Sequence, residues 1–371
     1  MVQKHLSYAE MTDLGCFYTP QKFVDKLIGM IKKHITDYDK YTFLDSSCGY
    51  GSFLKSLHPL NTIGCDIDKK AIEIASSIYP ESQYYILNTL NNFTRKTINI
   101  EPNEKLIIVG NPPYNDTTSK VKKNIKKDEP CKIDDDIKTR DLGISFLLSF
   151  NKLNPDYIAV LHPLSYMIKK TNYNLLKHFY KNYILIDHYI ISSQEFSMTS
   201  KSKGFPIIIA LYKKNTNGLK YSDILNMNFK TINNEIFNLR HDYIKNYISK
   251  YPSKGKSYKK DDILFFTMRD INALNRSRTF IEEYTNNSII IEKEKFAYYC
   301  YVDVFKDYIN KLPYYYGNCD VFINNAEFLS LQDIFITRSM EKHPWLKQKI
   351  KYNYNNNFYL IDQYFKNLFN L

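Results

Sequence analysis

A tetrapeptide that could do chemistry, Asn111-Pro112-Pro113-Tyr114, directly follows the apolar run 106–110. Two prolines hold the backbone rigid and carry no amide protons, so the Asn111 side-chain oxygen and the Pro112 carbonyl oxygen could both accept hydrogen bonds from a ligand. Such acceptors would bind the protons of a ring-attached amine and free its delocalised lone pair for attack. Tyr114 could stack on that ring. A proline turn that merely ends a strand is the alternative for Pro-Pro alone.

Residues suited to ligand binding also lie upstream, in the segment 43–54. There an apolar run ends at Asp45 and is followed by a turn that contains Gly49 and Gly51. Glycine has no Cβ, so the backbone of this turn could approach a ligand at the carboxyl edge of a sheet. A tight strand-to-helix connection without any ligand is the alternative reading of this pattern.

A third run, 62–66, ends in Asp66 about twenty residues after Asp45. An acid at this place can accept hydrogen bonds from both hydroxyls of a ribose. Asp68 better fits the N-cap of the following helix. These two runs predict a nucleoside cofactor, either a nicotinamide dinucleotide or S-adenosylmethionine. The Asn-Pro-Pro-Tyr segment favours S-adenosylmethionine, because it would prepare an amine to attack a methyl sulfonium.

The elements that must position these residues alternate between short β-type runs and longer amphipathic stretches, from Phe17 to about Lys214. This alternation predicts an α/β fold with a doubly wound, mainly parallel sheet and crossover helices. We expect a helix over 20–34, with Thr19 as its N-cap and Pro20 at its first position. The expected strands are 41–45, 62–66, 83–87, 106–110, 157–162, 183–190 and 207–213. Beyond residue 215 the alternation fades, so we place a domain boundary between 215 and 216.

Length and charge narrow the class of protein. A chain of 371 residues can form two domains with proper cores. Its net charge of +12 fits a protein that neutralises nucleic-acid phosphates. Codon bias in an AT-rich genome, which raises Lys and Asn, is the alternative explanation of that charge.

The cysteines and the apolar runs suggest neither a metal nor a membrane. The six cysteines show no close pair with metal-ligand spacing, so we expect reduced thiols and no metal. No apolar run reaches the roughly 18 to 20 residues of a membrane helix. The segment 1–10 lacks the pattern of a secretory signal, so we expect a cytoplasmic protein without membrane partners.

The order of these motifs resembles the amino-group DNA methyltransferases, and within them the gamma group that methylates adenine N6. The segment Cys16-Phe17-Tyr18-Thr19-Pro20 is similar to an additional N-terminal cofactor motif of that family. The resemblance covers roughly residues 15 to 213. It implies a Rossmann-like fold, S-adenosylmethionine as the cofactor, a catalytic domain over 1–215 that binds it, and a target DNA recognition domain over 216–371.

The resemblance also assigns roles to single residues. Asn88 stands where the family usually has an Asp that binds the adenine amine of the cofactor, and it still offers a carbonyl oxygen. Phe196 matches the aromatic residue of a late motif that contacts the target base, with Phe205 as the alternative. The cofactor contacts implied are Tyr18, Thr19, Pro20, Asp45, Ser47, Cys48, Gly49, Asp66, Ile67, Asn88 and Asn111.

Double-stranded DNA is the partner implied, and the target base would have to leave the duplex to reach the site. A cognate restriction endonuclease that acts separately is a second partner consistent with the resemblance, and we expect a monomer. Methyl transfer would be direct and in line. Residues expected to contact DNA are Lys122, Lys123, Lys126, Lys127, Arg269, Arg276 and Arg278.

Other functions share parts of this pattern. Asn-Pro-Pro-Tyr also suits methyltransferases that act on protein glutamine or on a guanine or adenine amine in RNA, because each presents a planar amine or amide. Those enzymes usually lack a large basic C-terminal half. A nucleic-acid-binding subunit with a decayed cofactor fold is the non-enzymatic alternative, and a fused nuclease is a third. We expect S-adenosylmethionine binding to exclude the decayed subunit.

Overall fold

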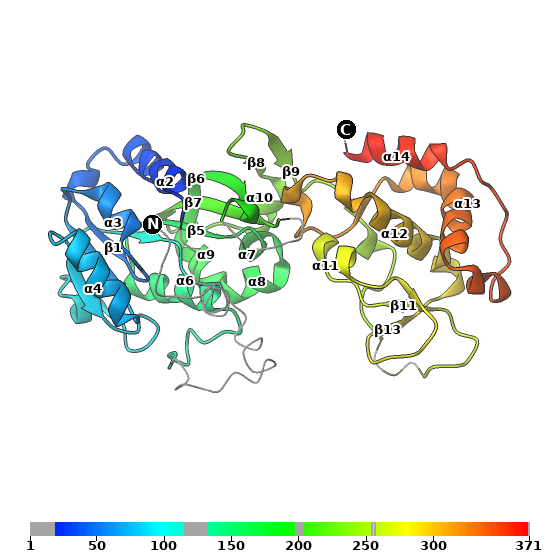
Figure 1. Ribbon diagram of the computed structural model, residues 1–371, viewed down its shortest axis with the longest axis horizontal. Coiled ribbons are helices and arrows are strands. Elements are labelled where there is room, and N and C mark those ends of the chain that lie inside the picture. Colours follow the sequence, from blue (N-terminus) through cyan, green and yellow to red (C-terminus); the bar gives the residue numbers. More distant parts are fainter. Residues whose placement is uncertain (1–18, 115–131, 197–203, 254, 256, 370–371) are drawn as a thin grey trace. The chain divides into compact units, whose positions relative to one another are not determined.

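The computed structural model describes residues 19–114, 132–196, 204–253, 255 and 257–369 (Figure 1). The chain divides into two compact units. The first consists of Met1–Lys201 and Pro206–Leu239, and the second of Ser202–Phe205 and Arg240–Leu371. Among the described residues, no helix combines the length and the apolarity that crossing a bilayer requires.

A seven-stranded sheet forms the centre of the first unit. Its strands are β1 (Thr42–Asp45), β2 (Thr62–Asp66), β3 (Gln83–Ile86), β4 (Leu106–Gly110), β5 (Tyr157–Pro163), β6 (Tyr183–Ser192) and β7 (Pro206–Lys214). They lie in the order β3-β2-β1-β4-β5-β7-β6. Strand β7 is antiparallel to both β5 and β6, and the other pairs are parallel. The predicted doubly wound, mainly parallel sheet is therefore confirmed.

The central strands are apolar because both of their faces are covered. Strands β1 and β4 are buried at every residue, as expected of parallel strands between helical layers. The helices of this unit are α2 (Gln21–His34), α3 (Ser52–Leu57), α4 (Lys69–Ile78), α6 (Leu142–Leu153), α7 (Ser165–Ile168), α8 (Lys170–Leu175), α9 (Lys177–Asn182) and α10 (Tyr221–Asn226). Helix α2 packs on β5, β7 and α3, and α4 packs on β2 and β3.

The start of α2 differs from the prediction. The apolar face expected from the sequence is buried, including Leu27, Ile31 and Ile35. However, Pro20 rather than Thr19 occupies the N-cap position, and no side chain caps the helix. The Thr19 hydroxyl instead accepts a hydrogen bond from the Asn111 side chain. Tertiary contact with the segment after β4 thus replaces the expected local cap.

The segment 216–239 belongs to the first unit, so the compact units divide at 239/240 and not at 215/216. It contains α10 and a hairpin of β8 (Asn228–Lys230) and β9 (Ile236–Asn238). Thr231 bridges to Ile190 of β6. The rings of Phe229 and Phe237 stack 5.3 Å apart and are buried. The hairpin buries these rings against the sheet edge, a contact between distant segments that local composition does not reveal.

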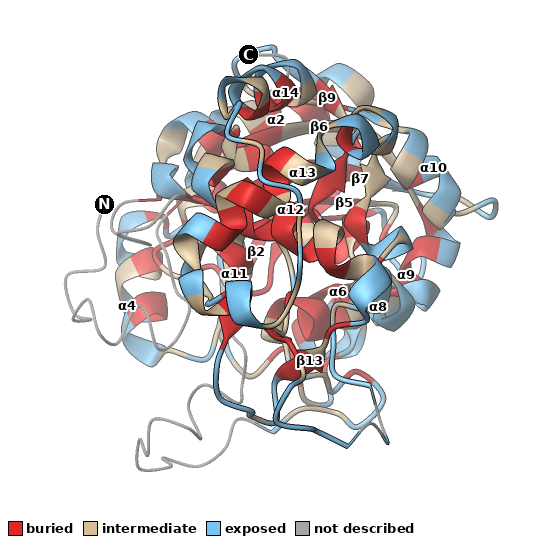
Figure 2. Ribbon diagram, turned by 90° about the vertical axis from the view of Figure 1, so that its right-hand side faces the viewer, coloured by how far each residue is buried: buried red, intermediate tan, exposed pale blue. Residues whose placement is uncertain are grey.

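The second unit is built around α12 (Phe296–Tyr308), which is buried along most of its length (Figure 2). It packs against α13 (Asn325–Lys342), and α13 packs against α14 (Tyr359–Phe369). The remaining elements are β10 (Asp242–Tyr243), β11 (Leu264–Phe266), α11 (Ile271–Arg276), β12 (Phe280–Ile281), β13 (Ser288–Ile290) and β14 (Phe322–Ile323). Aromatic rings such as Tyr301, Phe335 and Phe365 form its core. Some tyrosines of this region are core residues, namely Tyr299, Tyr301, Tyr315 and Tyr364, whereas others, such as Tyr251 and Tyr354, are exposed.

A buried carboxylate organises this aromatic core. Asp303 of α12 is fully buried and accepts hydrogen bonds from Thr279 (2.6 Å), Ser339 (2.9 Å) and His343 (3.1 Å). The Nζ atom of Lys342 lies 3.3 Å from the Oδ2 atom of Asp303. Burial alone would raise the pKa of Asp303, but the His343 hydrogen bond and the Lys342 charge outweigh it and hold the pKa below its ordinary value.

Replacing this carboxylate should destabilise the second unit. We expect Asp303→Asn to lower its free energy of unfolding by about 3 kcal/mol, because the substitution leaves buried donors and Lys342 without their charge partner. The fluorescence of Trp345, the single tryptophan, reports on denaturant unfolding of this unit. Because the folded pKa is depressed, the contribution of Asp303 is present above about pH 4 and is lost as the pH falls through the folded value.

Asp307→Asn is the matched control. Asp307 also contacts Lys342, at 2.9 Å, but its side chain is 39% exposed. Exposed pairs contribute about 0 to 1 kcal/mol. Equal destabilisation by the two variants would contradict the role assigned to Asp303.

Candidate active site

The functional residues predicted from the sequence gather at one edge of the sheet. Strands β2, β1 and β4 are parallel neighbours, so their carboxyl ends lie side by side. Asp66 ends β2, Asp45 ends β1, and Asn111 directly follows β4. This edge is where sheets of this type bind ligands.

Asp66 joins the ends of β1 and β2. One carboxylate oxygen accepts the amide of Gly49 at 2.8 Å, and the other accepts the amide of Asp68 at 2.9 Å. Gly49 has φ +51° and Gly51 has φ +76°, backbone conformations that glycine adopts without strain. The turn after β1 is therefore shaped by glycine and held by an acid from the neighbouring strand.

Asp68 and Ile67 have distinct roles beside Asp66. The Asp68 side chain caps α4 by accepting the amides of Lys70 (2.9 Å) and Ala71 (3.4 Å), as predicted. Ile67 is 62% exposed, which is unusual for a large apolar side chain next to a buried strand. An apolar ring bound beside Asp66 would cover it.

Asp45 is buried beneath the segment that carries Asn111. It is 2% exposed, and its Oδ1 accepts the Ser47 amide at 3.1 Å. Gly110 has φ +145°, and a Cβ there would lie 2.8 Å from the same oxygen. Burial raises the pKa of Asp45 to about 8, against the Ser47 hydrogen bond and with added repulsion from Asp66. Only glycine at 110 lets β4 pass this close to the acid.

The side-chain nitrogen of Asn111 is hydrogen-bonded to the segment before α2, and its side-chain oxygen faces away from that partner. Its Nδ2 donates to Thr19 Oγ1 at 3.0 Å, so the amide oxygen is directed away from Thr19. The Tyr114 hydroxyl donates to that oxygen. The Pro112 carbonyl accepts no hydrogen bond from any residue that the structure describes. The segment after β4 thus carries two oxygen acceptors on consecutive residues, and the Tyr114 hydroxyl covers the one on Asn111.

Three residues that the sequence analysis did not identify support Tyr114. The Tyr166 hydroxyl donates to Asp141, which caps α6 through the Gly143 amide at 3.0 Å. A Cβ on Gly143 would collide with the Tyr166 hydroxyl and lie 3.2 Å from the Tyr114 Cβ. The Tyr166 ring stacks on His162 at 5.5 Å. An acid before the apolar stretch 142–153 could have signalled the cap, but no local pattern marks Tyr166.

Several predicted site residues lie elsewhere. Phe196 is 2% exposed and its ring packs 5.9 Å from Phe23 of α2, a core position that does not support stacking on a target base. Phe205, the alternative, is partly exposed just before β7. Cys48 turns its side chain into a cluster with Leu54 and Ile72, so only its backbone faces the turn.

Asn88 follows β3 but is engaged locally. Its amide nitrogen donates to Lys132 O at 2.6 Å, and its oxygen accepts the Leu90 amide at 3.0 Å. That oxygen keeps a second lone pair, so the predicted contact stays available. Tyr18, Lys122, Lys123, Lys126 and Lys127 lie outside the described residues.

The residues at this edge fit a positively charged nucleoside. Burial and the neighbouring Asp66 raise the pKa of Asp45, and a cation bound beside these acids would favour their ionised forms. The Ser46 hydroxyl is buried without a hydrogen-bond partner in the described residues. No cluster of three or more His, Cys, Asp or Glu side chains in the described part of the chain could hold a metal ion.

Comparisons with known proteins concern the fold. No model of a protein family matches the chain, and no curated protein matches it. Solved structures similar to it include the 23S rRNA methyltransferase ErmE, with 12% identity over 55% of this chain and 72% of that one, at a TM-score of 0.36. A dimethyladenosine transferase from Plasmodium falciparum shows 16% identity over 54% and 63%, at 0.33.

The N-methyltransferase NodS from Bradyrhizobium japonicum WM9, in complex with S-adenosyl-l-homocysteine, shows 10% identity over 56% of this chain and 97% of that one, at a TM-score of 0.34. At these identities and TM-scores, the assignment of the fold class rests on the strand order and strand directions of the sheet. The order β3-β2-β1-β4-β5-β7-β6 with an antiparallel β7 is that of the Rossmann-like S-adenosylmethionine-dependent methyltransferases. This fold implies S-adenosylmethionine as the cofactor.

The buried Asp45 predicts an unusual pH dependence of stability. The pKa of Asp45 rises from 3.8 to about 8 on folding. Between pH 3.8 and about pH 8, the folded chain therefore keeps a proton on Asp45 that the unfolded chain has lost. The contribution of Asp45 to stability therefore falls as the pH rises from about 4 to 8. Asp45→Asn cannot ionise and should flatten this decline, measured as the thermal midpoint by circular dichroism between pH 5 and 8. Parallel profiles for the two proteins would contradict the buried acid.

Proposed function

We propose that this protein is a site-specific DNA methyltransferase that transfers a methyl group from S-adenosylmethionine to adenine N6 in double-stranded DNA, as the modification enzyme of a restriction-modification system. A separately acting endonuclease would be its companion, and the protein would act as a monomer. The observation that carries the proposal is the pair of acceptors after β4, the Asn111 amide oxygen and the Pro112 carbonyl, at the edge that Asp45 and Asp66 define.

The two acceptors suit an amine conjugated to a ring. Such a nitrogen is a poor nucleophile because its lone pair is delocalised. The Asn111 oxygen and the Pro112 carbonyl would bind its two protons and favour the pyramidal amine, so the lone pair becomes available. The hydrogen bond from Asn111 Nδ2 to Thr19 at 3.0 Å prevents the amide from presenting its nitrogen instead. Bound S-adenosylmethionine supplies the electrophilic methyl group.

Tyr114 supports adenine as the ring. Its hydroxyl covers the Asn111 oxygen, and an amine that takes this oxygen must displace it. The displaced ring would lie against the base, a contact worth about 1 to 3 kcal/mol per base. Extruding a base from the duplex costs a few kcal/mol, so such a contact helps to hold it. The basic net charge of +12 supports a nucleic-acid substrate.

The first test is transfer of labelled methyl from S-adenosylmethionine to double-stranded genomic DNA, followed by nucleoside analysis. We expect N6-methyladenine in the wild-type reaction. Asn111→Ala should retain cofactor binding and lose about 100- to 1000-fold in turnover, as expected when one preorganised hydrogen-bonding group is removed.

Asn61→Ala is the control for Asn111→Ala. Asn61 precedes β2, at the opposite edge of the parallel sheet, and its side chain donates to Thr42 at 2.6 Å. Its loss should leave turnover near wild type. Wild-type turnover in Asn111→Ala would exclude the assignment, and label in RNA or protein with unlabelled DNA would move it to those substrates.

Tyr114 variants separate ring stacking from hydrogen bonding. Tyr114→Ala should lower kcat/KM for DNA by about 5- to 150-fold, the equivalent of 1 to 3 kcal/mol of lost stacking. Tyr114→Phe keeps the ring and uncovers the Asn111 oxygen, so it should retain kcat/KM within a few fold. Steady-state kinetics on duplex DNA distinguish the two, and an equal loss in both variants would show that the hydroxyl, not the ring, is required.

A further inference from the structure

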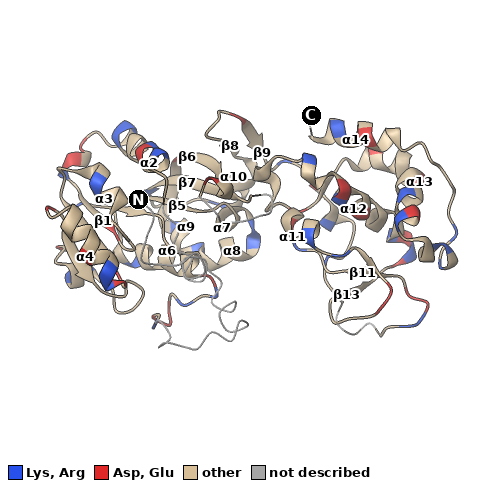
Figure 3. Cartoon of the chain, viewed as in Figure 1, with Lys and Arg blue, Asp and Glu red and all other residues tan. Residues whose placement is uncertain are grey.

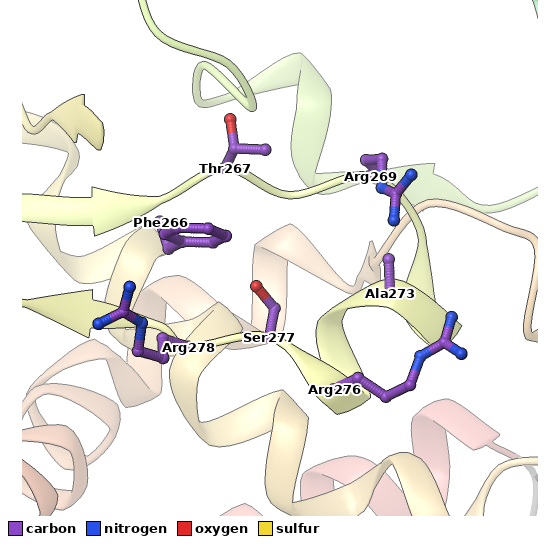
Figure 4. Close-up of a pocket in the computed structure, with 7 residues that line it drawn as sticks. All are labelled: Phe266, Thr267, Arg269, Ala273, Arg276, Ser277 and Arg278. Atoms are coloured by element: carbon purple, nitrogen blue, oxygen red, sulfur yellow. The ribbon is translucent and has the colours of Figure 1, made fainter. Parts of the chain in front are cut away.

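The second unit contains a pocket of about 340 Å³ whose lining includes three arginines (Figure 4). It is formed where β11 leads into α11 and where α11 leads towards β12. Arg269 and Arg276 point toward one another across Ala273, and Arg278 lies at the other end, beside Phe266 (Figure 4). The full lining is Phe266, Thr267, Arg269, Ala273, Arg276, Ser277 and Arg278.

The charge of this pocket is uncompensated. Within the described ranges, no carboxylate forms an ion pair with the guanidinium of Arg269, Arg276 or Arg278, and no carboxylate lines the pocket. The nearest acid in sequence, Asp270, accepts the Ala273 amide at 2.8 Å as the N-cap of α11. Helix α11 itself carries no acid, as Figure 3 shows.

Several other basic side chains of this unit have acidic partners, whereas lysines such as Lys347 and Lys366 form no ion pair with a described residue. Lys250 pairs with Asp320, Lys342 with Asp303 and Asp307, and Arg338 with Glu341 at 3.5 Å. Three arginines line this pocket without a carboxylate, so the pocket is suited to an anion that is not part of the chain.

All three arginines are exposed, and Arg278 also contacts an aromatic ring. The guanidinium carbon of Arg278 lies 5.4 Å from the centroid of the Phe266 ring, a cation–π contact that favours this position of the charge. The small side chain of Ala273 leaves room between Arg269 and Arg276. A guanidinium presents a planar fork of donors that matches two oxygens of a phosphate.

We propose that this pocket binds backbone phosphates of duplex DNA, so that the second unit grips the strand and does not read a base there. The shape favours phosphate over a base edge. Phosphates protrude from a duplex and can enter a recess, whereas base edges lie at the floor of a groove and are reached by projecting side chains. The choice of DNA rests on the proposed function, and the phosphate chemistry rests on the pocket alone.

The test is the salt dependence of duplex binding by the full chain without cofactor. Each phosphate contact that is lost makes the negative slope of log affinity against log salt less steep by about 0.9. For Arg269→Gln/Arg276→Gln/Arg278→Gln, we expect the change in Kd between 50 and 200 mM salt to be about 40-fold smaller than for the wild type. Two unrelated duplex sequences should weaken equally. A triple Lys variant keeps the charge and should keep the slope.

Arg338→Gln is the control, because Arg338 also lies over an aromatic ring, Phe358 at 5.3 Å, but does not line the pocket. It should bind as the wild type does. Thermal unfolding of each variant checks that it is folded. An unchanged salt slope in the triple Gln variant would overturn the proposal, and so would weakening confined to one sequence, which indicates base reading.

The same experiment separates this inference from the proposed function. Loss of salt slope in a protein that forms no N6-methyladenine would uphold the phosphate pocket and reject the proposed reaction. Formation of N6-methyladenine with an unchanged slope would reject the pocket alone. Binding of duplex RNA in place of DNA, with the same arginine dependence, would overturn the assignment to DNA.

Discussion

The close passage of β4 over the buried acid at the end of β1 is the constraint on which the site depends. Asp45 is buried and accepts a hydrogen bond from the Ser47 amide. It can lie this close to β4 only because residue 110 has no side chain. Parallel pairing brings the ends of these strands together, and this contact sets how Asn111 leaves the sheet. The predicted cofactor-binding residues Asp45 and Asp66 and the acceptor Asn111 are thereby placed at one edge.

The orientation of Asn111 shows how the first unit converts this placement into chemistry. A side-chain amide can present a donor or an acceptor, and the Thr19 hydroxyl takes the donor. The segment before α2 therefore fixes the orientation of the Asn111 amide and does not cap its own helix. Support for Tyr114 comes from a third region, through Asp141, Gly143 and Tyr166.

The charged residues of the second unit lie in different environments. Asp303 collects hydrogen bonds from separate elements and stabilises an aromatic core. Some exposed cations, such as Arg338, pair with a neighbouring acid. The pocket formed around α11 is lined by three arginines and by no carboxylate. A protein that binds a polyanion gains from such a place, since its arginines need not first leave internal partners.

The sequence by itself determined the strands of the sheet, the acids at their ends and the turn after β4. Apolar runs, glycines and prolines act locally, so their pattern could be recognised directly. Only the tertiary structure decided that Thr19 holds Asn111 and does not cap α2, that Phe196 packs on Phe23, and that residues 216–239 join the sheet. It also placed Arg269, Arg276 and Arg278 around one recess. These outcomes depend on which distant side chains compete for the same partner, and local patterns carry no information about that competition.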